Sequence, residues 1–296
     1  MTEPTPKPAK PPVEVSFEFF PPKSAEMEAT LWQAIEKLAP LRPRFVSVTY
    51  GADGSTRDRT HRIVSRIAAE TGLVSAPHLT CVGADRDEIR AIARTYRDEG
   101  IRHIVALRGD PPQGATTYVP HPGGYAYAAD LVRGLKEVAD FDLSVAAYPE
   151  VHPEAASPEA DLDNLKRKFD SGASRAITQF FYDTDNFLRF RDRCVARGIT
   201  GPIVPGILPI AKFRQMQNFA ARAGARVPDW LHERFAGLDD DPETQRMLGA
   251  SLAIEQVATL RRHGLTEFHF YTLNRAELTF AICCALGLRP VSGVAR

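Results

Sequence analysis

Short apolar runs recur along the chain, separated by segments with helical spacing. Eight of these runs occupy residues 15–19, 45–50, 76–81, 103–107, 144–148, 176–181, 203–208 and 268–273. Strand-like runs that alternate with helical segments are typical of βαβ units with parallel strands. Eight such units in 296 residues predict an α/β fold of the closed (β/α)8 type, the TIM barrel.

Residues that start and end helices support this pattern. Ser24 and Ser157 are placed to cap helices, and Pro158 occupies the first position of the second one. The segment between the last two strands should hold the barrel helix, a segment around Trp230 and a further helix that begins after Asp241. The earlier helices are expected over residues 25–38, 56–72, 85–99, 127–138 and from 158 onward.

Composition narrows the classes of function. Lys plus Arg equals Asp plus Glu at 37 each, so charge gives no reason to expect nucleic acid or an anionic membrane as partner. No apolar stretch approaches the length of a membrane span. Residues 1–12 are rich in Pro and Lys and lack the apolar segment of a secretory signal. We expect a disordered tail over 1–12, a single barrel domain over 13–290 and a cytoplasmic location.

No metal site is expected from the sequence. The four cysteines, at 81, 194, 283 and 284, show no C-x-x-C spacing and are interpreted as free thiols. The acidic run 239–241 precedes Pro242, which is ordinary chemistry for the start of a helix. A G-x-G-x-x-G fingerprint is also missing, so a bound dinucleotide would not lie on a Rossmann motif.

Polar residues at or near the ends of the predicted strands are the candidates for chemistry. The active site of a (β/α)8 barrel forms where the C-terminal ends of its strands meet. The residues at these positions are Glu18, Thr49, His78, Arg108, Asp110, Tyr148, Gln179 and His269.

Glu18 is flanked by Phe17, Phe19 and Phe20. Burial among these rings would raise the pKa of the carboxyl group and suit a general acid that works near neutral pH. The alternative is an outward-facing Glu on an alternating strand. Because both faces of a barrel strand are normally covered, the catalytic interpretation is favoured.

Other candidates are ambiguous from the sequence alone. Arg108 and Asp110 could bind a ligand or form a salt-bridged turn, and a lone strand histidine such as His78 is more often structural. The residues Asp161, Asn164 and Lys168 share one helix face, for which exposure to solvent is the default interpretation. Arg275 is expected near a helix N-terminus, where a cation is unfavourable unless it serves an anionic ligand.

Several long stretches together resemble one enzyme family. They are VSFEFFPPK (15–23), FVSVTYGA (45–52), APHLTC (76–81), IRHIVALRGDPP (101–112), SVAAYPEVHPEA (144–155), DNLKRKFDSGASRAITQFFYD (163–183), PGILPI (205–210) and FHFYTLNRAE (268–277). They resemble the 5,10-methylenetetrahydrofolate reductases of the bacterial single-domain type, and the likeness covers nearly all of the chain after the tail.

The resemblance implies a (β/α)8 barrel that holds FAD without a Rossmann fold. It implies ping-pong hydride transfer, in which NADH or NADPH reduces the flavin and methylenetetrahydrofolate then takes the hydride to become 5-methyltetrahydrofolate. That product supplies methyl groups for methionine synthesis. The resemblance also favours NADH as donor and a homo-oligomer, while the expected absence of metal, nucleic-acid and membrane partners rests on the composition and motifs above.

Residue roles follow from the same resemblance. Glu18 matches the family's general acid, and Asp110 matches a carboxylate near both flavin and pterin. The residues that match the FAD site are Thr49, Tyr50, Ala52, His78, Arg108, Gly109, Asp110, Ala128, Tyr148, His152, Ala155, Asp161, Asn164, Arg167 and Lys168. Those that match contacts to the folate or the nicotinamide nucleotide are Asp110, Gln179, Gln215, Phe219 and Arg275.

The loop over residues 113–125 is longer than the family pattern and affects how Tyr127 and Ala128 align with the flavin site. Three other classes were weighed: a barrel flavoprotein of the proline-dehydrogenase kind, a folate-binding barrel without catalysis, and a folate-dependent methyltransferase. Asp110 and Gln179 argue against the first. The presence of Glu18, Asp110 and Lys168 argues against the second, and the matched flavin-site residues argue against the third.

Overall fold

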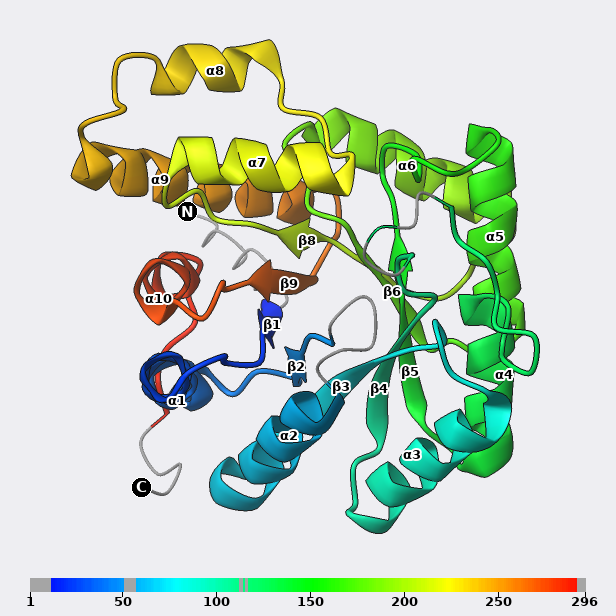
Figure 1. The fold of residues 1–296 in the computed structure, drawn as a ribbon. Coiled ribbons are helices and arrows are strands. Elements are labelled where there is room, and N and C mark those ends of the chain that lie inside the picture. Colours follow the sequence, from blue (N-terminus) through cyan, green and yellow to red (C-terminus); the bar gives the residue numbers. More distant parts are fainter. Residues whose placement is uncertain (1–11, 51–56, 112–113, 115–116, 292–296) are drawn as a thin grey trace, which may run out of the picture.

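A ring of parallel strands surrounded by helices forms the body of the protein (Figure 1). The computed structural model describes residues 12–50, 57–111, 114 and 117–291. The strands lie in the order β7-β6-β5-β4-β3-β2-β1-β9-β8. Their bounds are β1 (Glu14–Phe19), β2 (Val46–Val48), β3 (Ser75–Thr80), β4 (His103–Leu107), β5 (Asp142–Ala147), β6 (Arg175–Thr178), β7 (Ile203–Val204), β8 (Gly206–Ile207) and β9 (Glu267–Tyr271).

One segment closes the ring. The run predicted as a single strand over 203–208 forms two short strands on either side of Pro205. Its first half, β7, pairs with β6, and its second half, β8, pairs with β9. Pro205 lies between them and accepts a hydrogen bond from the His269 amide at 2.9 Å. Because both halves belong to one continuous segment, the ring is closed and the prediction of a TIM barrel is confirmed.

The closing segment needs a glycine at one position. A Cβ atom added to Gly206 would lie 2.1 Å from the carbonyl oxygen of Thr178 on β6. The Gly206 amide donates to the Thr178 hydroxyl at 2.9 Å. The two backbones therefore approach more closely than any larger residue would allow.

The helices follow the strands as expected. Ser24 caps the first helix by accepting from the Met27 amide, and Ser157 caps the fifth by accepting from Ala160. The bounds are α1 (Ala25–Leu38), η1 (Ala39–Leu41), α2 (Arg57–Thr71), α3 (Arg86–Asp98), α4 (Ala128–Val138), α5 (Pro158–Asp170), α6 (Thr184–Ala196), α7 (Phe213–Ala223), α8 (Asp229–Phe235), α9 (Pro242–Arg262) and α10 (Ala276–Ala285).

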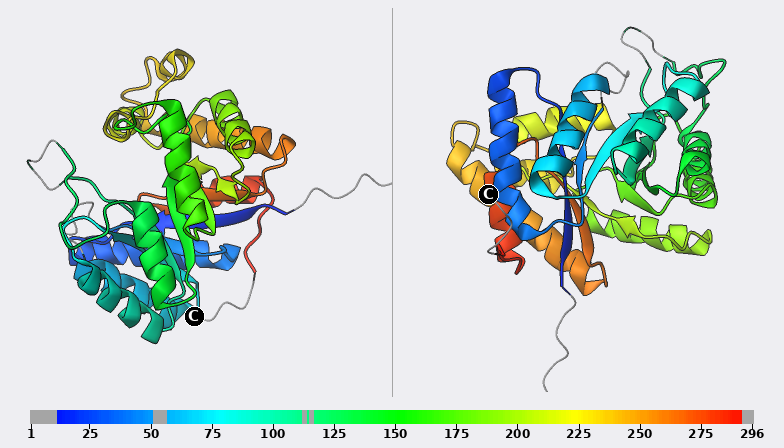
Figure 2. Two further views of the ribbon diagram at one scale, coloured as in Figure 1. Left: turned by 90° about the vertical axis from the view of Figure 1, so that its right-hand side faces the viewer. Right: turned by 90° about the horizontal axis from the view of Figure 1, so that it is seen from below.

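The long connection from β8 to β9 holds the two predicted helices, α7 and α9, and the predicted segment around Trp230 forms a third, α8. In Figures 1 and 2, α8 lies outside α7 and α9, as an outer layer over that side of the barrel. The rings of Phe213 and Phe235 stack at 4.6 Å and join α7 to α8. Asp241 caps α9 by accepting from the Thr244 amide, so the acidic run before Pro242 does serve as a helix start.

A polar network fills part of the barrel interior. His103 on β4 lies 2.8 Å from the Ser144 hydroxyl and 3.1 Å from Nη1 of Arg175. Nη2 of Arg175 donates to Asp142 at 3.0 Å, and the ring of Phe45 packs edge-on to His103. Burial lowers the pKa of His103 to about 3, so the neutral ring can accept from the Arg175 guanidinium.

Some predictions concern residues outside the described part of the chain. These are Ala52 and the tail, of which only Pro12 is described. Within the described residues, no helix has the length and apolarity to cross a membrane. The cysteines are free thiols; three are buried, and Cys284 is half-buried.

Candidate functional site

A large cavity opens at the C-terminal ends of the strands and extends to α4 and α5. Its volume is about 1060 Å³, which is at the upper end for ligand pockets. The lining contains Glu18, Gln179 and all but one of the residues expected at a flavin site: Thr49, Tyr50, His78, Arg108, Gly109, Asp110, Ala128, Tyr148, His152, Ala155, Asp161, Asn164, Arg167 and Lys168. Residues from six strands and two helices are thus brought to one place.

Three expected substrate contacts lie elsewhere. Gln215 and Phe219 belong to α7, and Arg275 is the exposed N-cap residue of α10. None of them lines the cavity as the structure describes it. Ala52, the remaining residue of the expected flavin set, lies outside the described residues.

Glu18 lies between two imidazoles. Its Oε2 atom is 3.3 Å from Nε2 of His78 and 3.4 Å from Nε2 of His269. The other ring nitrogen of His269 forms a 2.7 Å hydrogen bond with the hydroxyl of Ser16. Side chains from β1, β3 and β9 therefore form one buried acid–base cluster at the cavity.

The expected rise in the pKa of Glu18 is wrong. Burial by itself raises the pKa, but the imidazoles of His78 and His269 outweigh burial and lower it to about 2. The neighbouring phenylalanines led to the opposite expectation, because they are adjacent in sequence whereas the imidazoles are not. In this geometry the carboxyl group of Glu18 is ionised at neutral pH.

β9 contributes Tyr271 to the cavity, a residue that the sequence analysis did not assign. The Tyr271 hydroxyl donates to the Thr178 carbonyl at 2.8 Å, and the ring borders the cavity. Burial raises the pKa of Tyr271, which keeps the hydroxyl protonated. Because His269 and Tyr271 are two apart on a strand, the alternation of side chains could have grouped them.

Arg108 does not form a salt-bridged turn with Asp110. Its Nη1 and Nη2 atoms contact the carboxylate of Glu154, the latter at 3.2 Å, and its Nε donates to the Gly109 carbonyl at 2.9 Å. Asp110 is exposed, and no hydrogen bond or ion pair joins it to another described residue. Glu154, from the loop after β5, is a cavity residue that the sequence did not single out.

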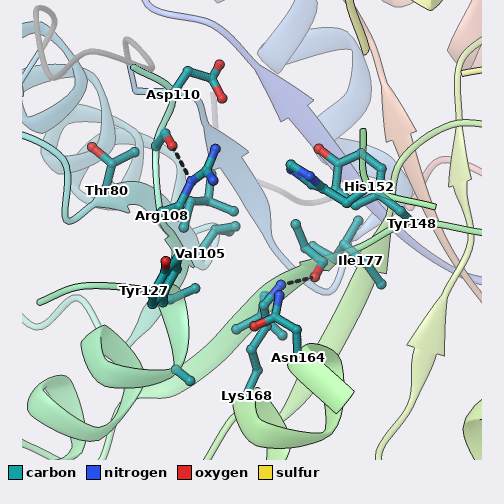
Figure 3. A pocket seen from close by; sticks show the side chains of 18 of the residues that line it. Thr80, Val105, Arg108, Asp110, Tyr127, Tyr148, His152, Asn164, Lys168 and Ile177 are labelled. Atoms are coloured by element: carbon teal, nitrogen blue, oxygen red, sulfur yellow. Dashed lines mark hydrogen bonds between the residues drawn. The ribbon is translucent and has the colours of Figure 1, made fainter. Parts of the chain in front are cut away.

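The polar face of α5 borders the cavity rather than open solvent. Figure 3 shows Asn164 and Lys168 projecting from this helix toward Ile177. The Lys168 amine donates to the Ala146 carbonyl at 2.8 Å, and Asp161 accepts from the His152 amide at 2.9 Å. Burial lowers the pKa of Lys168 to about 8, while the Asp161 carboxylate opposes the shift.

The wall of the cavity combines aromatic rings, cations and unused donors. The rings of Tyr148 and His152 meet edge to face at 4.7 Å (Figure 3). The buried Thr80 hydroxyl has no hydrogen-bond partner among the described residues, although it lines the cavity. Such a wall suits a long, partly aromatic and anionic ligand such as a dinucleotide. No group of His, Cys, Asp and Glu within the described ranges could hold a metal ion.

Comparison with known proteins gives the family. The sequence profile of methylenetetrahydrofolate reductase matches residues 6–287. The chain is 60% identical over 280 residues to 5,10-methylenetetrahydrofolate reductase of Pectobacterium carotovorum, covering 94% of this chain and 91% of that protein. It is 59% identical over 278 residues to the enzyme of the same name from Escherichia coli, covering 94% and 92%.

A solved structure shows the same fold at low identity. It is described as an uncharacterized protein from Clostridium thermocellum that binds two copies of 5-methyl-5,6,7,8-tetrahydrofolic acid. The TM-score is 0.60 at 16% identity, covering 94% of this chain and 95% of the other. The profile match and the close relatives show that the chain belongs to the methylenetetrahydrofolate reductase family.

Proposed function

We propose that the protein reduces 5,10-methylenetetrahydrofolate to 5-methyltetrahydrofolate by ping-pong hydride transfer from NADH through a bound FAD. The observation that carries this proposal is the cavity, because its lining gathers nearly the whole residue set expected around a flavin. The reductase activity follows from the family. The flavin, the donor and the order of steps are the parts that need testing.

The cavity has the chemistry to hold FAD. Arg108, Arg167 and Lys168 supply cations for a diphosphate, and Asp161 and Asn164 offer hydrogen-bonding groups on the same helix face. Tyr148 and His152 provide aromatic surface. A bound FAD would take hydride from the nicotinamide and pass it to the folate.

Glu18 and its two imidazoles would supply the proton that the folate needs. Opening of the one-carbon bridge requires protonation of the nitrogen that leaves. The proton would come from the cluster of Glu18, His78 and His269 acting as a unit, since the two imidazole nitrogens lie 3.3 and 3.4 Å from the carboxylate. Ser16 fixes the orientation of the His269 ring through its 2.7 Å hydrogen bond.

Asp110 and Gln179 would act on the ligands at the cavity. A carboxylate at Asp110 disfavours additional negative charge on a nearby flavin and so favours passing hydride onward. The amide of Gln179, just beyond β6, can donate to and accept from a heterocycle. If Gln179 contacts first the nicotinamide nucleotide and then the folate, its use by both substrates in turn agrees with a ping-pong order.

The proposal also includes a cytoplasmic homo-oligomer whose product serves methionine synthesis, on the strength of the family resemblance. NADH is preferred to NADPH on the same ground. Gln215, Phe219 and Arg275 are proposed folate or nucleotide contacts, although they lie outside the described cavity lining.

An anaerobic absorbance experiment tests the proposal in one vessel. The purified protein loaded with FAD should bleach on addition of NADH and recover its colour on addition of methylenetetrahydrofolate. Bleaching without recovery would remove folate as the oxidant and favour the proline-dehydrogenase kind of enzyme. A protein that cannot be loaded with FAD would refute the flavin mechanism and favour a folate-binding barrel or a methyltransferase.

A further inference from the structure

The loop between β4 and α4 places an aromatic residue in the cavity wall that the family resemblance does not assign. This residue is Tyr118, and its ring lies under the guanidinium of Arg108, 4.4 Å from ring centroid to Cζ. We propose that Tyr118 is a positioning residue that holds Arg108 ready for the diphosphate of a flavin nucleotide. This inference rests on the proposed function, because it takes FAD as the ligand.

The contacts of Arg108 leave part of its guanidinium available. The group has five N–H donors. Nε donates to the Gly109 carbonyl, and one donor each from Nη1 and Nη2 contacts Glu154. Two donors of this cavity-lining residue therefore have no partner among the described residues and can serve an anionic ligand. A planar guanidinium pairs well with phosphate oxygens, provided that its plane is fixed.

Tyr118 fixes that plane from one face. A cation within about 6 Å of a ring centroid is attracted to the face of the ring. Glu154 contacts an edge of the Arg108 guanidinium and fixes the direction in which that edge points. The Tyr118 ring packs against the face of the guanidinium and fixes the tilt of its plane. Without the ring, only the in-plane hydrogen bonds to Glu154 and Gly109 would hold the guanidinium, and its plane could tilt about them.

Tyr118 is itself held in place. Its hydroxyl donates to the Ala126 carbonyl at 2.8 Å, one residue before Tyr127, the N-cap of α4. The thiol of Cys81 approaches the same hydroxyl at 3.9 Å from the end of β3. Burial raises the pKa of Tyr118, so the hydroxyl stays a donor. The ring is thus held within its own loop and by a contact with the residue that follows β3.

The neighbouring residue provides a matched control. Val119 follows Tyr118 in the loop, and its side chain is 75% exposed. Substitution of Val119 alters the loop without touching Arg108. Any effect specific to Tyr118 must therefore come from its position in the cavity wall.

The test is FAD affinity of the apoprotein, measured by quenching of flavin fluorescence. Tyr118→Leu should weaken FAD binding by about three- to thirtyfold, the range of a cation–π contact. Tyr118→Phe keeps the ring and should bind within about threefold of wild type. Val119→Ala should bind as wild type does. Thermal unfolding of each apoprotein checks that all four proteins are folded.

A double-mutant cycle separates positioning from a general structural role. In an Arg108→Gln background, Tyr118→Leu should cause no further loss of FAD affinity, because the residue through which it acts is gone. The same loss in both backgrounds, an unchanged affinity in Tyr118→Leu, or a Phe variant as weak as the Leu variant would each overturn the inference. Failure of the proposed function is distinct, because the wild-type protein itself would then not bind FAD.

Discussion

Replacement of Glu18 by glutamine tests the acid–base cluster most directly. The pKa of Glu18 is lowered to about 2 by the imidazoles of His78 and His269. At pH 7, protonating this carboxyl from water would therefore cost five pKa units, or about 7 kcal/mol. That cost is too large for an isolated general acid, so the proton must come from the cluster as a unit.

The two half-reactions should respond differently to Glu18→Gln. Glutamine keeps the size of the side chain but cannot transfer a proton, so hydride transfer to the folate should fall by about 10²- to 10⁴-fold. Reduction of the flavin by NADH needs no such proton and should stay within about threefold of wild type. Anaerobic stopped-flow absorbance measures each step separately.

Glu14→Gln is a matched control on the same strand. Glu14 is an exposed residue that pairs with Arg44 at 3.2 Å and does not line the cavity, so its substitution should change neither half-reaction. Equal losses in both half-reactions of Glu18→Gln would refute the reasoning, since they would mark Glu18 as structural or flavin-binding. An unchanged folate step would refute it as well.

Three further predictions concern other parts of the molecule. Asp110→Asn should make the flavin easier to reduce, because it removes a negative charge from the cavity wall; an unchanged potential in a redox titration would contradict this assignment. The pKa of Lys168 falls from 10.5 to about 8 on folding, so the folded protein binds fewer protons than the unfolded chain between these values and gains stability as the pH rises across that window. Lys168→Met should lose this gain, and urea unfolding at both ends of the window measures the difference; equal pH dependence in the two proteins would contradict the shift. Arg175→Met should lower the free energy of unfolding by about 1–3 kcal/mol, because it removes the hydrogen bonds of a buried guanidinium to His103, Ser144 and Asp142, whereas Arg44→Met should cost about 1 kcal/mol or less. Similar costs for the two substitutions would show that burial does not increase the contribution of the Arg175 network to stability.

Local signals predicted most of the elements. Ser24, Ser157 and Asp241 all cap helices where the sequence placed helix starts. The division of the seventh strand at Pro205 could not be predicted in the same way. An apolar run shows that a segment is buried but not which neighbours each half pairs with, and that pairing depends on residues up to the last strand.

The site was predictable as a set of positions but not as an electrostatic environment. The motifs placed Glu18 and His78 at strand ends, and the structure brings both to one cavity. The pKa of Glu18 depends on His269, which lies 251 residues away in the chain. Tyr118 was missed for the same reason, because only the folded loop brings its ring against Arg108. Interactions between distant segments decide charge and orientation, and these are invisible to local patterns.

Closure of the ring has a consequence for how the chain can be made. β1 begins at Glu14, yet one of its two neighbours, β9, begins only at Glu267. During synthesis, the edge of β1 that pairs with β9 therefore stays unpaired until almost the whole chain has been made. The edge of β8 that pairs with β9 stays unpaired for the same reason. Exposed edges favour pairing with other chains, and non-local pairing is slow. A chain that stops before residue 267 would keep these edges open, so loss of the last thirty or so residues should cause aggregation rather than yield a smaller stable barrel.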